Sequence, residues 1–292
     1  MLLFDKLLIL FWGAVSTASL LILFISETDQ DTGLTKKVFL KQDANKDIIL
    51  RPKEEFSRRP KIQIPKTIIR PNSVFIGTGF KVSDNLWMSA RHVLGDCSSS
   101  YVNASYGSND EDLRLIETVF IHPDSDLVMF RFENDAPHFV VPTITSKETK
   151  NSLLRTTAFT AGYPVGIPGQ LHVKYLGKAA LSNINYDIME PIFVWTLSTK
   201  TPESLTTVGG ISGGPLFNSE SKIIGVTIAE QVRRGTVSSA DLKSINWLLG
   251  AVKNQTHSQS EIQDEINPEN FNDVADTYRG EPSIVQLVCN TA

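Results

Sequence analysis

The sequence predicts an all-β fold for the central part of the chain, on three observations. Short runs of β-branched and aromatic residues follow one another from residue 67 to about residue 249, and turn residues separate them. Strands that are this short and closely spaced are typical of a sandwich or a barrel. No sequence period of 20 to 50 residues repeats, which excludes solenoids and propellers.

The expected strands, in chain order, cover residues 73–82, 85–90, 115–122, 126–133, 157–164, 192–199 and 222–229. After them, residues 240–252 carry apolar side chains at helical spacing. These are Leu242, Ile245, Leu248 and Leu249. We expect this amphipathic helix to end the domain.

The composition is that of a globular protein, with 41% hydrophobic and 21% charged residues among 292. A net charge of -4 without a basic stripe gives no indication of a nucleic-acid partner. The chain has two cysteines and no Cys/His cluster with zinc-ligand spacing, so we expect neither a metal nor a cofactor. Cys97 and Cys289 either form one disulfide or remain free thiols, and the sequence leaves both states open.

An uncharged apolar segment occupies residues 7–25. As a helix it would be about 28 Å long, close to the hydrocarbon thickness of a bilayer. A cleaved secretory signal has a shorter apolar core of roughly 7–15 residues, so residues 1–26 are predicted to be a transmembrane helix, an anchor or uncleaved signal. A cleaved signal is the alternative.

The polar regions on either side complete the predicted organisation. Residues 27–65 are charged and interrupted by prolines, which is typical of a linker. Residues 66–252 form the predicted domain. Residues 253–292 are mostly polar and are predicted to be a C-terminal tail.

The glycine-rich stretch GGISGGPLF, residues 209–217, surrounds Ser212 with four glycines. A serine hydroxyl becomes a nucleophile only beside a base, and His92 in SARHVL directly follows an expected strand. The base in turn needs a buried carboxylate that fixes its tautomer. In HPDSDLVMF, Asp126 directly precedes an expected strand and is favoured over Asp124, which follows a proline and is expected to cap the turn.

SARHVL, SDLVMF and GISGGPLF resemble the three signature segments of the chymotrypsin/trypsin-like serine peptidases, in that family's chain order. The separations, 34 residues from His92 to Asp126 and 86 from Asp126 to Ser212, suit a compact member. GTGF at 77–80 and AGYP at 161–164 are similar to the bacterial Deg/HtrA-type branch. The resemblance covers roughly residues 68–250 and implies two packed six-stranded antiparallel β-barrels.

The resemblance also implies roles for these residues. His92, Asp126 and Ser212 would be the catalytic triad, and the backbone N–H groups of Gly210 and Ser212 would form the oxyanion hole. The implied substrate pocket consists of Thr206, Thr207, Val208, Thr227, Ile228 and Ala229. Neither pocket segment contains a carboxylate, so we expect a preference for small or medium apolar residues at the cleavage site rather than for Arg or Lys.

Two departures from the family pattern matter. Ile211 occupies the position at which trypsin-like zymogens place an aspartate that pairs with a new N-terminus. Isoleucine cannot form that ion pair, so another contact, from the substrate or a partner, is expected to shape the oxyanion loop. We also expect no peptide-binding PDZ module after residue 249.

These predictions combine into a membrane-tethered serine endopeptidase that cleaves polypeptide substrates through an acyl-enzyme. The alternative is a catalytically silent pseudoprotease that acts as a binding protein at the membrane, and an esterase of another fold is disfavoured because His92 precedes Ser212. Lys36, Lys37 and Lys41 weigh against export under the positive-inside rule, whereas the resemblance to a secreted class favours it. The catalytic domain is therefore expected on the extracytoplasmic side, periplasmic or extracellular, and secreted if the signal is cleaved.

Overall fold

The computed structural model describes residues 59–64, 66, 70–83, 85–103, 112–132, 144, 156–251 and 265–292. The predicted anchor over residues 1–26 lies outside the described residues, as does most of the predicted linker over 27–65. Within these described ranges, the structure contains no helix with the length and apolar character needed to cross a membrane.

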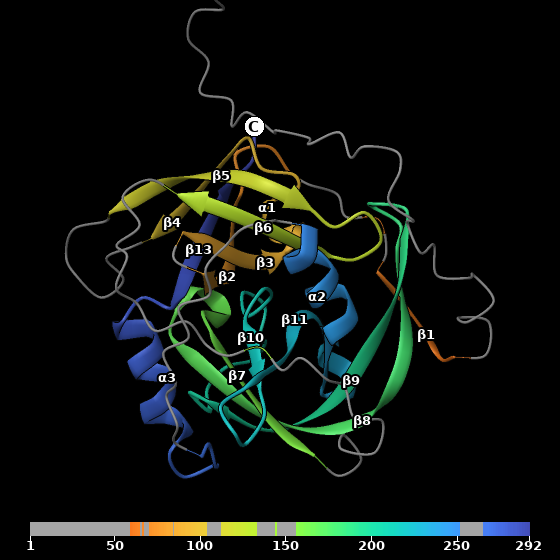
Figure 1. Ribbon diagram of the computed structural model, residues 1–292, viewed down its shortest axis with the longest axis vertical. Coiled ribbons are helices and arrows are strands. Elements are labelled where there is room, and N and C mark those ends of the chain that lie inside the picture. Colours follow the sequence, from red (N-terminus) through yellow and green to blue (C-terminus); the bar gives the residue numbers. More distant parts are fainter. Residues whose placement is uncertain are drawn as a thin grey trace, which may run out of the picture. The chain divides into compact units, whose positions relative to one another are not determined.

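The first β-barrel combines five strands from the N-terminal half of the fold with the last strand of the chain (Figure 1). They close in the order β13-β2-β3-β6-β5-β4, and every pairing is antiparallel. The strands are β2 (Val74–Ser83), β3 (Leu86–Ala90), β4 (Ser99–Asn103), β5 (Leu113–Ile121), β6 (Leu127–Phe132) and β13 (Ile284–Asn290).

The second β-barrel is formed by six strands that follow one another in the sequence. They are β7 (Thr157–Gly162), β8 (Gly169–Asn183), β9 (Ile188–Thr201), β10 (Pro215–Phe217), β11 (Ile223–Gln231) and β12 (Thr236–Ala240). The long β8–β9 hairpin closes the ring β8-β7-β10-β11-β12-β9. The prediction of two six-stranded antiparallel barrels is therefore confirmed.

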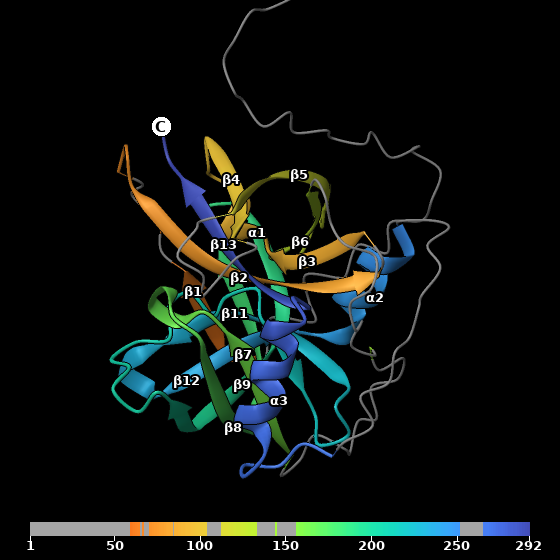
Figure 2. The same ribbon diagram turned by 90° about the vertical axis from the view of Figure 1, so that its left-hand side faces the viewer.

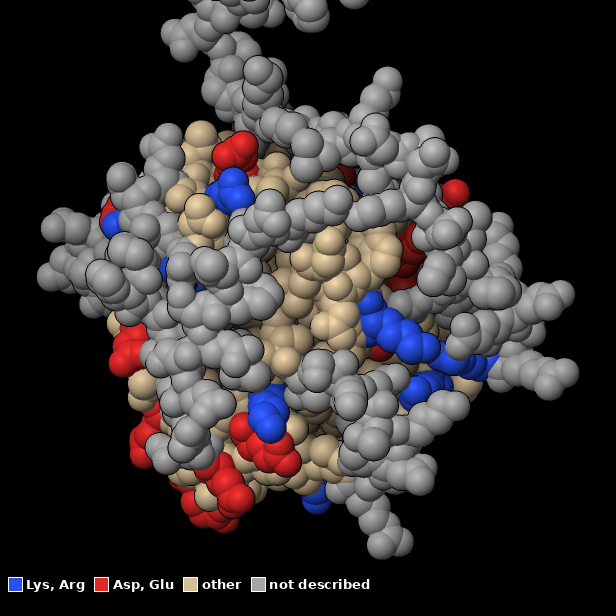
Figure 3. Space-filling view, in the orientation of Figure 1, with Lys and Arg blue, Asp and Glu red and all other residues tan. Residues whose placement is uncertain are grey.

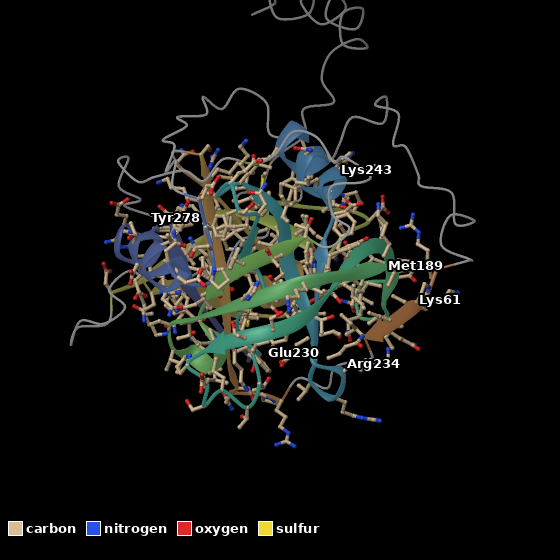
Figure 4. The ribbon with its side chains drawn as sticks, turned by 90° about the horizontal axis from the view of Figure 1, so that it is seen from below. Lys61, Met189, Glu230, Arg234, Lys243 and Tyr278 are labelled. Atoms are coloured by element: carbon tan, nitrogen blue, oxygen red, sulfur yellow. A yellow bond between two sulfur atoms is a disulfide. The ribbon has the colours of Figure 1, made fainter. Side chains whose placement is uncertain are left out.

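The strand β1 (Lys61–Ile64) lies inside the predicted linker and corrects that part of the prediction. It pairs in parallel with Ala180 to Asn183 of β8, and Ile62 and Ile64 pack against the core. Alternate apolar residues in KIQI give a short strand an inward face even though charges and prolines surround it. Figure 4 shows Lys61 of β1 and Tyr278 of the last helix at opposite sides of the second barrel.

Short helical segments connect the strands. They are α1 (Arg91–Leu94), the 3₁₀ turns η2 (Pro164–Gly166) and η3 (Val232–Arg234), α2 (Leu242–Ala251) and α3 (Phe271–Gly280). The predicted helix over 240–252 is confirmed as α2. Asp241 caps its start, because the carboxylate accepts the backbone N–H of Ser244 at 3.0 Å.

The described C-terminal residues are part of the fold, so the predicted polar tail over 253–292 is wrong from residue 265 onward, and α2 does not end the domain. The helix α3 packs on the second barrel, where Phe271 lies 5.0 Å from Phe159 and Tyr278 stacks on Phe217 at 5.1 Å, measured between ring centroids. The strand β13 then enters the first barrel between β2 and β4 (Figure 2).

The polar outer face of α3 explains why the sequence pattern predicted a polar tail instead of a helix. Phe271, Ala275 and Tyr278 are buried, whereas Asp273 and Asp276 are exposed. Acidic side chains gather at the lower left of the face drawn in Figure 3, where Figure 1 has α3. An average over the segment records these charges and hides the apolar stripe beneath them.

A disulfide attaches the last strand to the segment that follows α1. Cys97 and Cys289 are bonded, with their Cα atoms 5.4 Å apart and a sequence separation of 192. The question that the sequence left open is thus resolved in favour of a disulfide. It joins β13 to the chain five residues after His92.

Candidate active site

His92 lies where the first barrel turns from a strand into a helix. The strand β3 (LWMSA) is buried along its whole length, and Ala90 is still extended, with φ -74° and ψ 138°. The short helix α1 begins at the next residue, which places the His92 side chain at the end of the strand. The His92 side chain is 33% exposed.

Asp126 ends the tight turn between β5 and β6 and is fully buried. In this turn His122 accepts the backbone N–H of Asp124 through Nδ1 at 3.1 Å, and its own N–H donates to Leu127 at 3.0 Å. The His122 ring lies 4.4 Å from that of Trp247 on α2. His122 and Asp124 therefore organise the turn, and Asp126 is carried inward by the start of β6.

Two hydrogen bonds join Asp126 to His92. The carboxylate oxygen Oδ2 lies 2.7 Å from His92 Nδ1, and Oδ1 accepts the backbone N–H of His92 at 2.9 Å. The backbone N–H of Arg91 donates to the Asp126 carbonyl at 3.0 Å. Since both carboxylate oxygens bind the same residue, the ring orientation of His92 is fixed relative to its backbone.

The electrostatics of the pair favour a protonated ring. Burial alone would lower the pKa of His92, but the charge of Asp126 and its hydrogen bond act in the opposite direction, with a further contribution from Asp96. The net effect raises the pKa of His92 above its ordinary value of 6.5. A carboxylate that holds Nδ1 in this way leaves Nε2 as the ring nitrogen that can accept a proton.

Ser212 belongs to the second barrel, but its backbone is bound to the first. Its carbonyl accepts the backbone N–H of Thr78 on β2 at 2.9 Å. The next residue, Gly213, has φ +89°, and a Cβ there would overlap the Thr78 carbonyl and lie 3.0 Å from the nitrogen of Ala90, two residues before His92. This close approach explains the need for glycine. The loop thus lies against the end of β3.

The structure joins two of the three predicted triad members directly. A hydrogen bond links His92 to Asp126, whereas Ser212 reaches the same junction through backbone contacts, and no bond between its hydroxyl and His92 is among those of the described residues. His92, Asp126 and the backbone of Ser212 therefore lie around the place where β2 and β3 of the first barrel meet the glycine-rich loop of the second.

The chain's own residues hold the Ser212 loop, the predicted oxyanion hole, for which the sequence led us to expect a contact from a substrate or a partner. Gly210 has φ +102°, and a Cβ there would overlap the Tyr163 carbonyl. The Thr78 hydroxyl donates to the Gly210 carbonyl at 2.8 Å and accepts the backbone N–H of Tyr163 at 3.1 Å. The N–H of Val165 donates to the Gly209 carbonyl at 2.6 Å.

Ile211 points away from the loop surface. It is buried in an apolar cluster of the second barrel, together with Val208 and Leu216. The side chain that replaces the zymogen aspartate thus stabilises the loop by apolar burial. Thr78 lies in the GTGF segment, but its role was not visible in the sequence, because its hydroxyl bonds to two loops that lie 85 and 132 residues further along the chain.

The predicted pocket residues divide into two groups. The side chains of Val208, Thr227 and Ile228 are buried, and Val208 and Ile228 belong to the hydrophobic core. Among the other three, Thr206 is exposed and Thr207 and Ala229 are partly buried. Of the six residues predicted to form a substrate pocket, these three have accessible side chains, and the pocket itself stays a prediction.

A carboxylate that the sequence analysis did not consider joins the two pocket segments. Glu230 directly follows Ala229, and its carboxylate accepts the Thr207 hydroxyl at 2.6 Å and the backbone N–H of Val208 at 3.0 Å. Figure 4 labels Glu230 on the second barrel. These bonds tie β11 to the start of the Ser212 loop.

The described residues contain no group of three or more His, Cys, Asp or Glu side chains placed to hold a metal ion. Two further histidines of the sequence, His138 and His257, lie outside the described residues. His172 is a partly buried residue of β8, stacked on Phe159 at 5.0 Å between ring centroids. Burial and the neighbouring Lys174 lower its pKa.

Comparison with solved structures gives several similar folds. The active form of the Rv3671c protease from M. tuberculosis is 17% identical, with 64% of this chain and 83% of that chain covered and a TM-score of 0.45. The MamO protease domain from Magnetospirillum magneticum is 16% identical, with 63% and 97% covered and a TM-score of 0.43. A human pathogenic astrovirus serine protease is 14% identical, with 60% and 92% covered and a TM-score of 0.40.

No curated protein sequence matches the chain. The family model of the trypsin-like peptidase domain matches residues 77–226, about half of the chain. The match begins at the GTGF segment of β2, ends in β11, and includes His92, Asp126 and Ser212. The chain belongs to the family of trypsin-like peptidase domains.

Proposed function

We propose that the chain is a serine endopeptidase that hydrolyses polypeptides through an acyl-enzyme. The single observation that carries the proposal is the His92–Asp126 pair, in which a fully buried carboxylate binds His92 Nδ1 at 2.7 Å beside the Ser212 loop. Membership of the trypsin-like peptidase family supports the same chemistry.

In the proposed first step, the Ser212 hydroxyl oxygen attacks the scissile carbonyl carbon while His92 Nε2 takes the hydroxyl proton. Asp126 stabilises the imidazolium that forms and does not itself take the proton. The negative charge that develops on the substrate oxygen is received by the backbone N–H groups of Gly210 and Ser212. The left-handed conformation of Gly210 supports this role, because it turns a peptide unit that a residue with Cβ could not turn without overlap.

In the proposed second step, His92 gives its proton to the leaving amine and the C–N bond breaks, which leaves the acyl group on Ser212. A water molecule then attacks the ester, again with His92 as base, and Ser212 is released with its proton restored. None of these steps uses a group beyond the chain's own residues, the peptide and water.

The cellular setting is part of the proposal. We infer that residues 7–25 anchor the chain in a membrane and that the catalytic domain lies on the extracytoplasmic side. The Cys97–Cys289 disulfide supports this placement, because disulfides persist in oxidising compartments and are rare in the cytosol. Membrane fractionation, with protease digestion of intact cells, tests it. A catalytic domain protected from external protease in cells with a permeable outer layer would contradict it.

The test of the activity compares the wild-type chain with Ser212→Ala and His92→Gln in the hydrolysis of a denatured protein substrate. We expect hydrolysis by the wild type and a loss of at least about 1,000-fold in kcat for either variant, with circular dichroism unchanged. Equal hydrolysis by Ser212→Ala would contradict the proposal. A folded wild type that does not hydrolyse any substrate would favour the alternative, a membrane-tethered binding protein.

A further inference from the structure

Glu190 is a buried carboxyl group in an otherwise apolar stretch of β9. Its side chain has no solvent exposure, and its neighbours in the strand include Ile188 and Ile192 of the core. Burying a carboxyl group is costly unless hydrogen bonds satisfy it. The partners of Glu190 therefore indicate what this group stabilises.

Both partners belong to the turn that carries Asp126. Glu190 Oε1 accepts the backbone N–H of Asp126 at 2.9 Å, and Oε2 forms a short hydrogen bond with the Ser125 hydroxyl. Ser125 is fully buried as well. The carboxyl group thus binds two consecutive residues of one turn in a fork-like arrangement.

These bonds cross from one barrel to the other. Glu190 lies in the second barrel, on β9, whereas the turn connects β5 and β6 of the first. The other bonds of Asp126 run to the opposite side, because its carbonyl accepts Arg91 and its carboxylate binds His92. Glu190 therefore bonds the Asp126 turn to the second barrel, while the Asp126 carboxylate bonds His92 within the first barrel.

The charge state of Glu190 follows from its surroundings. Burial first and the negative charge of Asp126 second raise the pKa of Glu190 from 4.5 to about 8, and Asp241 before α2 contributes in the same direction. The hydrogen bonds from Ser125 and from the Asp126 backbone oppose this rise. At neutral pH Glu190 therefore carries a proton and adds no second charge beside Asp126.

We propose that Glu190 is a positioning residue that fixes the Asp126 turn across the junction of the two barrels and thereby sets the orientation of His92. This inference rests on the proposed function, because the orientation of His92 matters only if His92 acts as the base. A carboxyl group suits the position, since one of its oxygens accepts the Asp126 N–H and the other accepts the Ser125 hydroxyl.

Kinetic measurements on the full chain test the proposal. Glu190→Ala removes the acceptor of the Asp126 N–H, and we expect kcat to fall by up to about 100-fold with KM nearly unchanged, because a misplaced base affects the reaction and not substrate binding. Glu190→Gln keeps the shape of the side chain and an acceptor for the Asp126 N–H, and its amide N–H can bond the Ser125 oxygen once that hydroxyl rotates, so it is expected to restore most of the kcat lost in Glu190→Ala. Glu117→Gln, at an exposed glutamate of β5, is the matched control.

The pH dependence of kcat/KM distinguishes a loss of His92 positioning from a general loss of stability. In Glu190→Ala the acid limb of kcat/KM is expected to move to lower pH, because a loosened Asp126 no longer raises the pKa of His92 to the same extent. Ser125→Ala removes one of the two bonds and is expected to give a smaller change in the same direction. Full kcat and an unmoved acid limb in both Glu190→Ala and Ser125→Ala would overturn the proposal, as would a Glu190→Gln variant as impaired as Glu190→Ala.

A stability measurement tests the same contact without any activity. Since the folded pKa of Glu190 lies above the unfolded value, the folded state keeps its proton between pH 4.5 and about 8 while the unfolded chain loses it. The unfolding constant of the wild type, divided by that of Glu190→Gln, should therefore rise by about tenfold per pH unit across this window. On either side of the window this ratio should level off. A ratio that stays constant would contradict the buried contact.

The two proposals fail in different ways. If the wild-type chain does not hydrolyse peptides, the proposed function fails, and the unfolding measurement still decides whether Glu190 is buried against the Asp126 turn. If the wild type is active but Glu190→Ala retains full kcat and the wild-type acid limb, the positioning role of Glu190 fails while the proposed function stands.

Discussion

The two barrels differ in the distance along the chain over which they close. The second barrel uses six consecutive strands, and its long β8–β9 hairpin completes the ring. The first barrel closes only when β13 pairs with β2, which begins 210 residues earlier at Val74. Because loop-closure entropy opposes such distant pairings, the first barrel is expected to form only after the rest of the chain is in place.

The proposed catalytic groups divide along the same boundary. The first barrel supplies His92 and Asp126, which are charged or ionisable and held by side-chain hydrogen bonds. The second barrel supplies the Ser212 loop, which is held by glycine geometry and backbone bonds. The C-terminal segment connects the two, since α3 packs on the second barrel and β13 completes the first. Activity should therefore depend on the C-terminal strand.

Removal of residues 284–292 should have the largest effect. Without β13, both β2 and β4 become open edges, and the buried side chains of Ile284, Val285 and Leu287 are lost. We expect no stable first barrel and no hydrolysis. Amide hydrogen exchange measures this directly, because β2 to β6 should exchange freely while β8 and β9 retain protection.

Point variants provide the control for that deletion. Leu287→Ala in β13 should lower the free energy of unfolding by about 2–5 kcal/mol, whereas Leu176→Ala, at a residue of β8 that is 62% exposed, should change it by less than about 0.5 kcal/mol. Equal effects of the two variants would contradict the role assigned to β13.

Loss of the disulfide is the next largest expected effect. A bond that closes a loop of this length stabilises the folded state by up to about 5 kcal/mol in the chain-entropy model. The variant with Cys97→Ser and Cys289→Ser should unfold at lower denaturant concentration, and reductant should have the same effect on the wild type but none on the variant. If the comparison of the barrels is correct, hydrogen exchange increases in β2, β4 and β13 before it increases in β8.

Thr78→Val tests the hydrogen bonds that join β2 of the first barrel to the Ser212 loop of the second. Valine keeps the shape of threonine but leaves the Gly210 carbonyl and the Tyr163 N–H without their partner. We expect stability to fall by roughly 1–3 kcal/mol and kcat by up to about 100-fold. Thr78→Ser keeps the hydroxyl and is the matched control, with most of kcat retained. Equal kcat in the two variants would show that the hydroxyl does not shape the loop.

The pH dependence of His92 is the smallest predicted effect. Because its folded pKa is raised, kcat/KM should rise with pH through a value above 6.5, where the ring becomes the neutral base. The free energy of unfolding changes in the opposite direction with pH. The stabilisation that protonated His92 gains from Asp126 is complete below pH 6.5 and is lost as the pH rises through the raised pKa. In Asp126→Asn the NMR titration of His92 should move to lower pH. An unmoved titration would contradict the ion pair.

Sequence patterns predicted the elements that carry a continuous run of β-branched and aromatic residues or a clear helical spacing. The runs of β-branched and aromatic residues at 73–82 and 222–229 predicted β2 and β11, and the helical spacing after residue 240 predicted α2. The strand β13 was missed because IVQLVCN is a short apolar run inside a polar segment, and only its distant partner β2 makes it a barrel strand. For the same reason β1 was assigned to a linker.

The candidate site shows the same limit. His92, Asp126 and Ser212 stand in recognisable segments, so their order and strand contexts were visible in the sequence. The role of Glu190 was not visible in the sequence. Nothing near Glu190 indicates that its carboxyl group accepts the backbone N–H of Asp126, 64 residues earlier. Burial and hydrogen bonding of such a group depend on how the two barrels meet, which no local pattern encodes.

The central claim is that the His92–Asp126 pair of one barrel activates Ser212 of the other. Its most direct test is the rate of covalent labelling by a fluorophosphonate, with the modified residue located by mass spectrometry, in the wild type, His92→Gln and Asp126→Asn. We predict a single adduct on Ser212 and rates at least about 1,000-fold lower in both variants, which remain folded. An adduct on another residue, or undiminished labelling of His92→Gln, would contradict the claim.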